Sequence, residues 1–468
     1  MLPAGSETSL RNPEKTLYLR QDLMEMKSFI SEPWKRLVAF ERSKGRLFWL
    51  LVVIAATLGV AAYDSRLSSN PEDWRIRGDL TRFTLAASRL MLSGQNPYDA
   101  DLLQGNAYRY FPLNAVVYAP LTWVPIPLAQ GFWVAVNLVL LIWALRVHRA
   151  LAGLARAHAG IWIFALLIGF RFIKDNFQLG QWNLPVYSLT VLGLWVILCK
   201  KRPWCGGWIV ALAASLKLMP IAFVAYFAVK RQWRPTAAIL LGVVFWILLF
   251  PALCLGFERH NALFHAYFDQ GVGDVQDMMS ERLATGHSLL VTVYAYLTPT
   301  LKHSAHKLDM QINLLSLEPQ TAEHVALGVC ILLVVLTLAV FWRKGGDTAP
   351  GRRTILELGI LFMVMLLISP EARKAQLLTV FTPAFALAAV YWSAKAGSFE
   401  KRLSLGTIVL GVVLILVSSS LGKDLGIRPY ALSYGSLTLL LLTHYGALML
   451  LHRRQPDPPS SSGRGVSE

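Results

Sequence analysis

The chain has 468 residues, of which 55% are hydrophobic and 16% are charged, with a formal net charge of +17 and a mean hydropathy of +0.47. It contains repeated apolar runs of about 17 to 25 residues, the length that crosses a bilayer. Its Lys and Arg residues lie in short clusters between these runs and form no basic domain. The composition therefore excludes nucleic-acid binding and predicts an all-α, polytopic membrane protein.

The expected elements follow in chain order. Residues 1–45 are charged throughout and are predicted to form a cytoplasmic tail. The tail 455–468 is rich in Pro, Ser and Gly and is predicted to be disordered and cytoplasmic, which leaves 46–454 as the transmembrane domain. Ten spans are expected in that domain, near 46–63, 128–147, 161–175, 184–199, 236–256, 323–342, 354–369, 375–394, 404–421 and 431–452.

Positive charge predicts the orientation of these spans. The short loops 146–156, 200–202 and 230–234 contain Lys and Arg but no Asp or Glu. Loops of this composition face the cytoplasm. Both termini are therefore expected inside a plasma membrane, and the longer loops 64–112 and 257–286 are expected on the periplasmic or exterior side.

The first outer loop contains the leading catalytic candidate, Asp79. A carboxylate held at the outer membrane surface of an apolar chain is suited to take a proton from an acceptor hydroxyl. The alternative is an N-cap role, because Asp is favoured at helix starts. An amphipathic interfacial helix is expected after it, from four apolar residues at helical spacing: Leu80, Phe83, Ala87 and Leu90.

Residues around the next two spans are candidate substrate ligands. Arg171 and Lys174 end one span and are either phosphate-binding groups or interfacial cations. Gln181 and Asn183 begin the following span, where they either orient sugar hydroxyls or simply start the helix.

The segment 206–229 is predicted to be a broken hairpin. It leaves the cytoplasm after Arg202 and returns to it at Lys230, with Lys217 and Pro220 at its midpoint. Two half-length helices give about twelve spans in total, and such a break is tolerated only where it lines a cavity or is buried in protein. A lysine at this depth is costly, so Lys217 either binds a phosphate, snorkels to the surface or forms a buried ion pair.

The second outer loop, 257–286, is acidic and contains two glycines, which predicts a mobile flap. His287 follows it and is interpreted either as a second polar group of the site or as a solvated histidine. Tyr98 in the first loop is interpreted as a turn residue or as a substrate contact. The acids of the second loop match no ligand set, so no metal is predicted.

Five motifs occur in a characteristic order: Asp79-Leu80, Asn96-Pro97-Tyr98-Asp99, Tyr110-Phe111-Pro112-Leu113, Gly180-Gln181-Trp182-Asn183-Leu184 and Leu216-Lys217-Leu218-Met219-Pro220. In this order and spacing the chain resembles the polyprenyl-phosphate-mannose-dependent mannosyltransferases of glycosyltransferase family 87. The resemblance covers roughly 46–395. It implies a membrane bundle of the GT-C type and an active site on the outer face, served by a carboxylate at the place of Asp79.

The resemblance also implies the reaction and its partners. The enzyme would transfer a hexose, which is mannose in this family, from a polyprenyl-phosphate donor to a lipid or glycan acceptor among membrane lipids. The lipid-linked donor is a substrate, and no cofactor is expected. The turn after Ser369-Pro370 lacks the histidine that the family often carries, and Glu371, Arg373 and Lys374 are the candidate replacements for its polarity. The alternatives are a transporter or lipid flippase, or a non-catalytic relative.

Overall fold

The computed structural model describes residues 79–99, 101–103, 108–271, 286–299, 301–303, 309–343 and 348–455. The chain divides into two units, Met1–Gly59 and Val60–Glu468, and every described residue belongs to the second. The predicted N-terminal tail, the predicted span 46–63 and the predicted C-terminal tail after Gln455 lie outside the described residues.

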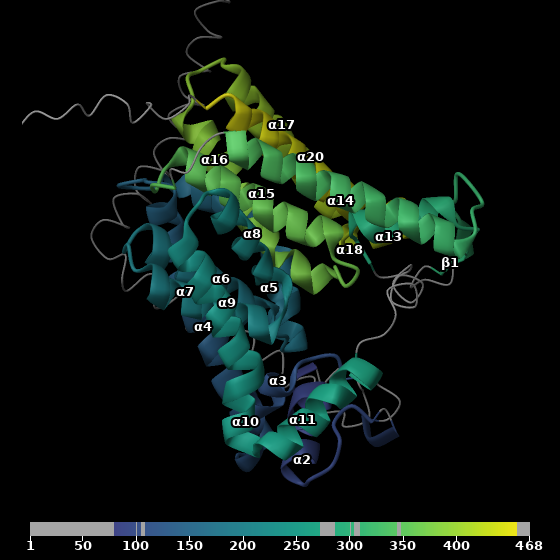
Figure 1. Ribbon diagram of the computed structural model, residues 1–468. Coiled ribbons are helices and arrows are strands. Elements are labelled where there is room, and N and C mark those ends of the chain that lie inside the picture. The colour runs from purple at the N-terminus through teal and green to yellow at the C-terminus, as the bar shows by residue number, and fades with distance from the viewer. Residues whose placement is uncertain are drawn as a thin grey trace, which may run out of the picture. The chain divides into compact units, whose positions relative to one another are not determined.

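The first half of the second unit is helical (Figure 1). Its elements are η2 (Leu80–Leu85), α2 (Ala86–Leu92), η3 (Asp101–Leu103), α3 (Pro112–Tyr118), η4 (Ala119–Trp123), α4 (Ile126–Leu151), α5 (Ala159–Leu179), α6 (Asn183–Leu198), α7 (Pro203–Leu216), η5 (Met219–Ile221), α8 (Ala222–Val229), α9 (Trp233–Val244), η6 (Phe245–Leu249), α10 (Phe250–Leu255), α11 (Phe257–Ala266) and η7 (Tyr267–Gly271). Each span predicted between 128 and 256 falls on one of these helices or on a continuous run of them.

The second half adds further helices and one short hairpin. Its elements are α13 (Leu289–Leu297), β1 (Leu301–His303), β2 (Asp309–Gln311), α14 (Pro319–Arg343), α15 (Arg352–Ile368), η8 (Lys374–Val380), α16 (Phe381–Ser393), α17 (Phe399–Val417), α18 (Ser420–Asp424), α19 (Arg428–Ser433) and α20 (Ser436–Arg453). The two strands pair antiparallel, with Lys302 opposite Met310. The described residues contain no other strand, so the predicted all-α class is confirmed.

Burial within this unit is typical of a membrane bundle. Among the residues that the structure describes, four helical runs are long and apolar enough to cross a bilayer: Leu128–Leu151, Trp233–Leu255, Pro319–Arg343 and Lys374–Ser393. Helix α15 is buried continuously from Thr354 to Leu367, as expected for a helix that is apolar on all sides. Helix α14 instead exposes Ile331, Leu332 and Val335. Exposed apolar stripes of this kind are expected on a helix that is surrounded by lipid instead of water.

The break predicted between 206 and 229 is confirmed. Helix α7 ends at Leu216, Lys217 is extended, and the chain resumes in η5 and α8. A Cβ atom on Gly207 would meet Ala238, and one on Gly242 would meet Ala211. The later residue of α7 thus meets the later residue of α9, so the two helices run parallel. Helix α8, which lies between them in the sequence, therefore runs in the opposite direction.

The outer loops differ in part from the prediction. The predicted helix after Asp79 is present as η2 and α2, but Leu80 and Ala87 are buried against the protein. Its apolar face therefore packs on the bundle and does not serve as a lipid-facing surface. The described part of the predicted flap forms α11 and η7, and α11 packs with α3 and α10 (Figure 1). Residues 272–285 of that flap lie outside the described part.

Candidate functional site

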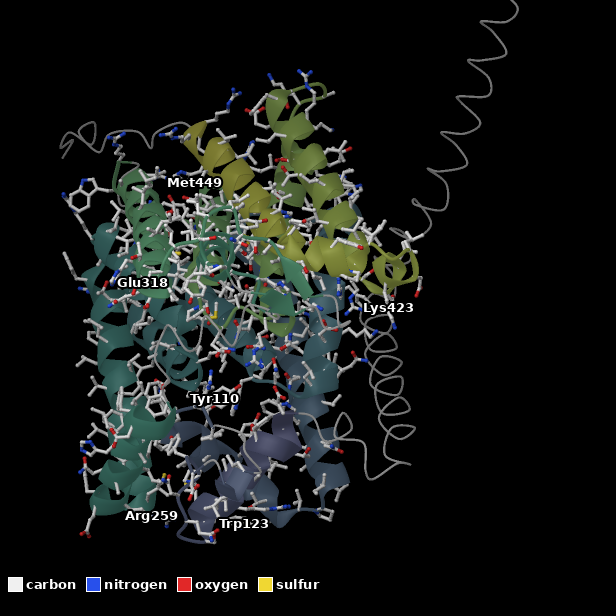
Figure 2. All side chains as sticks on the ribbon, turned by 90° about the vertical axis from the view of Figure 1, so that its right-hand side faces the viewer. Tyr110, Trp123, Arg259, Glu318, Lys423 and Met449 are labelled. Atoms are coloured by element: carbon white, nitrogen blue, oxygen red, sulfur yellow. The ribbon has the colours of Figure 1, made fainter. Side chains whose placement is uncertain are left out.

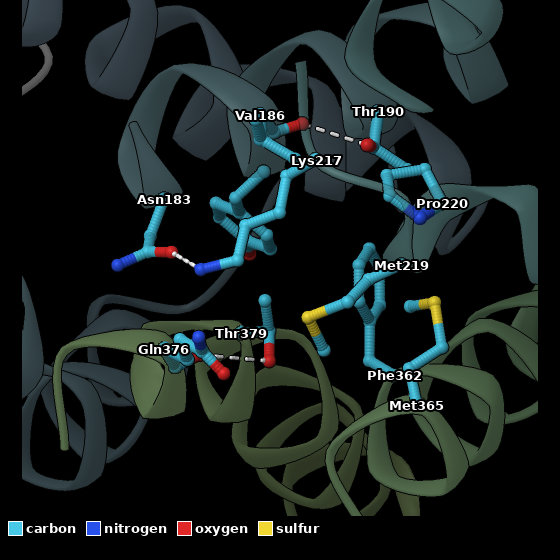
Figure 3. A pocket seen from close by; sticks show the side chains of 11 residues that line it. Asn183, Val186, Thr190, Lys217, Met219, Pro220, Phe362, Met365, Gln376 and Thr379 are labelled. Carbon is cyan, nitrogen blue, oxygen red and sulfur yellow. Dashed lines mark hydrogen bonds between the residues drawn. The ribbon is translucent and has the colours of Figure 1, made fainter. Parts of the chain in front are cut away.

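Four predicted site residues form one chain of hydrogen bonds. The Lys217 ammonium donates from Nζ to Asn183 Oδ1 at 2.6 Å, as Figure 3 shows. Asn183 Nδ2 donates to Gln181 Oε1 at 2.6 Å. Gln181 Nε2 then donates to Asp79 Oδ2. A cation and a carboxylate that are far apart in the sequence are thereby held in one site.

All the hydrogen bonds of this series are donated in the same direction, from Lys217 toward Asp79. An ammonium group only donates, and an ionised carboxylate only accepts. Each amide between them must therefore accept on the side of Lys217 and donate on the side of Asp79. Hydrogen bonds aligned in this way polarise one another. The arrangement thus supports an ionised Asp79 at one end and a charged Lys217 at the other.

Asp79 is not a helix cap. It occupies the N-cap position of η2, as the sequence allows, but its side chain makes no capping hydrogen bond. Its carboxylate accepts from Gln181 instead. The helix-start interpretation of Gln181 and Asn183 is incomplete for a similar reason. Asn183 begins α6, yet both amides are engaged in the chain between the two charges.

The corner between α5 and α6 positions Gln181. Gly180 ends α5 with φ +64°, in the left-handed region that favours glycine. A Cβ atom there would lie 2.9 Å from the Cβ of Leu80. The Gly180 carbonyl accepts from Trp133 Nε1 at 3.2 Å. The corner thus packs directly on the residue after Asp79, which brings Gln181 to the carboxylate.

The end of α7 positions Lys217. Asn114 of α3 is fully buried and donates from Nδ2 to the Leu216 carbonyl at 3.2 Å. A helix end leaves its last carbonyls without intrahelical partners, so this bond satisfies one of them. Lys217 follows with φ −156° and ψ 122°. Sequence reasoning did not identify Asn114, because its role depends on a residue far away in the chain.

A second group of charges surrounds the Lys217 ammonium. Arg109 Nη1 bonds Glu371 Oε1 at 2.9 Å, and Arg373 Nε lies 3.5 Å from Glu371 Oε2. Glu371, Arg373 and Asp79 all act electrostatically on Lys217. The predicted position of Glu371 at the site is thus compatible with the structure. The sequence had named Arg373 together with Glu371 as replacement polarity in this turn, but it had not singled out Arg109, which lies in the predicted loop 64–112.

Tyr110 lies beside these charges and is labelled in Figure 2. Burial, followed by the nearby Asp79 carboxylate, raises the pKa of its hydroxyl above the ordinary value, whereas Arg373 opposes that shift. The hydroxyl therefore stays protonated at neutral pH and is able to donate a hydrogen bond near Asp79. The sequence presented Tyr110 only as part of a motif.

A pocket opens next to Lys217 (Figure 3). Its polar end has Asn183, Lys217 and Gln376, and its apolar lining is Val186, Tyr187, Met219, Pro220, Phe362 and Met365. The Gln376 side-chain oxygen is buried and accepts no hydrogen bond within the described residues. The space between these side chains is small, and Thr190 and Thr379 also line it, so the lining combines a cation, amides and hydroxyls with hydrocarbon. Gln376 was missed because it lies inside a predicted span.

Two predicted residues are buried instead of exposed to substrate or solvent. Tyr98 has 2% of its surface exposed and donates its hydroxyl to the Tyr110 carbonyl at 2.8 Å. It supports the loop beneath Tyr110. His287 is 3% exposed, which corrects its interpretation as a solvated histidine. Its backbone amide bonds the Ala372 carbonyl at 2.8 Å, so it borders the turn that contains Glu371.

Arg171 and Lys174 are not grouped with Lys217. Arg171 donates to the Ser418 carbonyl and hydroxyl, each at 2.7 Å, at the end of α17. Both cations interact electrostatically with Asp175. None of the three acts on Lys217. Within the described residues, no group of three or more His, Cys, Asp or Glu side chains is arranged to hold a metal ion.

The helices and the site together define a class, the multi-pass helical membrane protein with a charged site where its helices end. The chain belongs to glycosyltransferase family 87, whose model matches residues 108–370. The match includes Gln181, Asn183 and Lys217; Glu371 follows its last residue directly, whereas Asp79 lies well before its first residue. No solved structure matches the chain.

Curated relatives match shorter parts of the chain. A polyprenol-phosphate-mannose-dependent alpha-(1-2)-phosphatidylinositol mannoside mannosyltransferase of Mycolicibacterium smegmatis is 29% identical over 27% of this chain and 31% of its own length. Its namesake from Mycobacterium tuberculosis is 25% identical over 43% of this chain and 50% of its own. An alpha-(1->3)-arabinofuranosyltransferase of Corynebacterium glutamicum is 26% identical over 29% and 32%. The chain thus spans between about a third and a half of these relatives.

Proposed function

We propose that the protein is a membrane glycosyltransferase that transfers a hexose, mannose by analogy with its relatives, from a polyprenyl-phosphate donor to a lipid or glycan acceptor. One observation carries the proposal. Asp79 and Lys217 stand at the two ends of a single hydrogen-bonded chain. Transfer of a sugar between two oxygens needs a base on one side and a cation on the other.

Each residue then has one task. The acceptor oxygen attacks the anomeric carbon while its proton passes to the Asp79 carboxylate. The bond from that carbon to the phosphate oxygen breaks, and the electron pair leaves with the polyprenyl phosphate, whose negative charge Lys217 stabilises. Gln181 and Asn183 orient the two charged groups. Gln376, which lines the same pocket, contacts a sugar hydroxyl.

We place this reaction on the outer face of the plasma membrane, with both termini cytoplasmic. The proposal is supported by the acid-free, positively charged loops on the opposite side of the predicted spans. The names of two relatives, which state a polyprenol-phosphate-mannose donor and a phosphatidylinositol mannoside acceptor, support the proposed donor and acceptor classes. The reaction needs no cofactor, because the donor arrives as an activated lipid.

The test is a transfer assay with purified protein in lipid vesicles. Radiolabelled polyprenyl-phosphate mannose, glucose and arabinofuranose are offered with phosphatidylinositol mannosides and short mannosides as acceptors. We expect labelled product from the mannose donor in the wild-type protein and loss of that product in Asp79→Asn. Product from the arabinofuranose donor alone would contradict a hexose as the transferred sugar. Folded protein that transfers no sugar from any of these donors to any of these acceptors would contradict the proposed donor and acceptor classes.

A further inference from the structure

Another cluster of charged residues, distinct from the Asp79–Lys217 site and from the charges around Glu371, has no role in the proposed transfer. It contains Arg171, Lys174 and Asp175 near the end of α5, Lys374 at the start of η8 and Arg428 at the start of α19. All four cations act electrostatically on the Asp175 carboxylate. We refer to these five residues as the α5–α19 cluster.

Positive charge in the α5–α19 cluster exceeds negative charge by three. Arg171 is partly accounted for, because it bonds the carbonyls of Ile415 and Ser418 at the negative end of the α17 dipole. The charge of Arg428 is not balanced in this way, because its Nε is buried and has no hydrogen-bond partner within the described residues. Like charges gathered in a half-buried place are unfavourable unless an anion joins them.

The cluster is separate from the Asp79–Lys217 site. Lys217 interacts with Glu371, Arg373 and Asp79. Lys374 interacts with Arg428, Arg171 and Asp175. Arg373 and Lys374 are adjacent in the sequence, but they belong to two different groups of interacting charges.

The segment next to the cluster has the character of a membrane-interface segment. After α17 ends, α18 and α19 carry exposed apolar and aromatic side chains: Leu421, Leu425, Ile427, Tyr430 and Tyr434. Such side chains at the ends of membrane helices are typical of the lipid headgroup region. Arg428 lies in the middle of this segment, so the cluster is expected at the depth where phospholipid phosphates lie.

We propose that the α5–α19 cluster binds the phosphate of an anionic phospholipid. The unesterified oxygens of a phosphodiester accept hydrogen bonds, and they complement the Arg428 Nε and the Lys374 ammonium. The acyl chains of the lipid would lie against the exposed apolar side chains of α18 and α19. This inference does not depend on glycosyl transfer.

The test measures lipid binding by native mass spectrometry of detergent-purified protein. The probes are phosphatidylglycerol, phosphatidylcholine with the same acyl chains, and inorganic phosphate. We expect phosphatidylglycerol to be retained over phosphatidylcholine, and its affinity to fall about fivefold in Lys374→Gln and in Arg428→Gln. Lys423→Gln is the matched control, because Lys423 is an exposed cation on the same segment (Figure 2). Arg428→Lys should restore part of the affinity.

Three outcomes would overturn the inference: equal retention of the two lipids, equal affinity in the Lys374 and Lys423 variants, or displacement of the lipid by inorganic phosphate at similar concentration. The last outcome would identify a site for free phosphate. Asp79→Asn should retain phosphatidylglycerol like the wild type. A failure of the lipid site and a failure of the proposed transfer are therefore seen in separate measurements.

Discussion

At the scale of single residues, Lys217 and Asp79 are connected indirectly through two amides. A direct ion pair would neutralise both groups and leave neither for a substrate. The amides of Asn183 and Gln181 hold the charges in one site while keeping them apart. This spacing leaves the proposed base free to act on the acceptor hydroxyl and the proposed phosphate-binding cation free to act on the donor.

Asp79→Asn tests the base. The asparagine retains an oxygen that accepts from Gln181, so the local structure should survive, but it cannot take a proton from the acceptor. We expect the turnover rate to fall about 10²- to 10⁴-fold, with donor affinity little changed. Asp424→Asn, at an exposed position on α18, is the control. A near-wild-type rate in the Asp79 variant would move the base elsewhere, with Glu371 the first alternative.

Lys217→Met tests the phosphate contact. Methionine preserves the apolar stem but removes the ammonium, and charge-assisted hydrogen bonds contribute about 1.5–3 kcal/mol. The donor KM should rise at least about tenfold, because the lost contact is present before the reaction begins. Lys395→Met, at an exposed loop position, should leave KM unchanged. Equal KM values in the two variants would remove Lys217 from donor binding.

At the scale of elements, the α5–α6 corner links the two halves of the site. The break after α7 sets the position of Lys217, whereas the corner sets the position of Gln181. Gly180 serves both the left-handed turn and the close approach to Leu80. Activity should therefore depend on this glycine beyond its effect on the backbone.

Gly180→Ala and Gly397→Ala form a matched pair. Both glycines have similar positive φ values, +64° and +73°, but a Cβ atom on Gly397 would meet nothing within 4 Å. Each substitution carries the left-handed backbone cost of about 1–2 kcal/mol. Only Gly180→Ala should also lower the transfer rate, because its Cβ displaces Gln181 from Asp79. Equal transfer rates in the two variants would show that the corner has no positioning role.

At the scale of the whole molecule, a buried charge network joins three helices at the end where the loops are predicted to be cytoplasmic. Glu357 of α15 accepts from Lys230 at 2.7 Å, Tyr226 at 2.8 Å and Arg353 at 3.1 Å, and its carboxylate lies 2.9 Å from His452 of α20. The side chains of Glu357, Lys230 and His452 are fully buried. Sequence reasoning had placed Lys230 only as a loop cation.

Glu357→Gln should destabilise the fold strongly. It leaves Lys230 and Arg353 without their counter-charge, and breaking a buried pair costs about 3–5 kcal/mol. The double variant Lys230→Met with Glu357→Met should be more stable than the single variant, because it removes both buried charges. Thermal unfolding in detergent measures both, with exposed Glu318→Gln as the control (Figure 2). A single variant as stable as that control would contradict the network's role.

Membrane orientation is a further property of the whole molecule. We expect Gln95→Cys to react with an impermeant thiol reagent from outside, and Lys395→Cys to react only after permeabilisation. Both positions are exposed. The four native cysteines are replaced first, because Cys205 and Cys254 are exposed and would add background. The reverse labelling pattern would place the Asp79 loop in the cytoplasm and remove the outer-face reaction.

The sequence by itself determined the membrane class, the helices between 128 and 256 and the break at Lys217, whereas the predicted spans 404–421 and 431–452 are each interrupted, after Val417 and after Ser433. These properties are local: hydropathy over a window sets a span, and a lysine followed by a proline interrupts it. The motifs also pointed to Asp79, Gln181, Asn183 and Lys217. Their separate roles could be listed from the sequence, but their connection could not.

Only the tertiary structure decided how these residues meet. Gln181 reaches Asp79 across 102 positions, and Lys217 reaches Asn183 across 34. The same long-range packing buries Tyr98 and His287 and draws Arg171 to the end of α17. A local sequence pattern identifies the chemical type of a side chain, whereas the partners of that side chain depend on contacts between distant segments. That is why the sequence identified the charged groups and the fold assigned them to two sites.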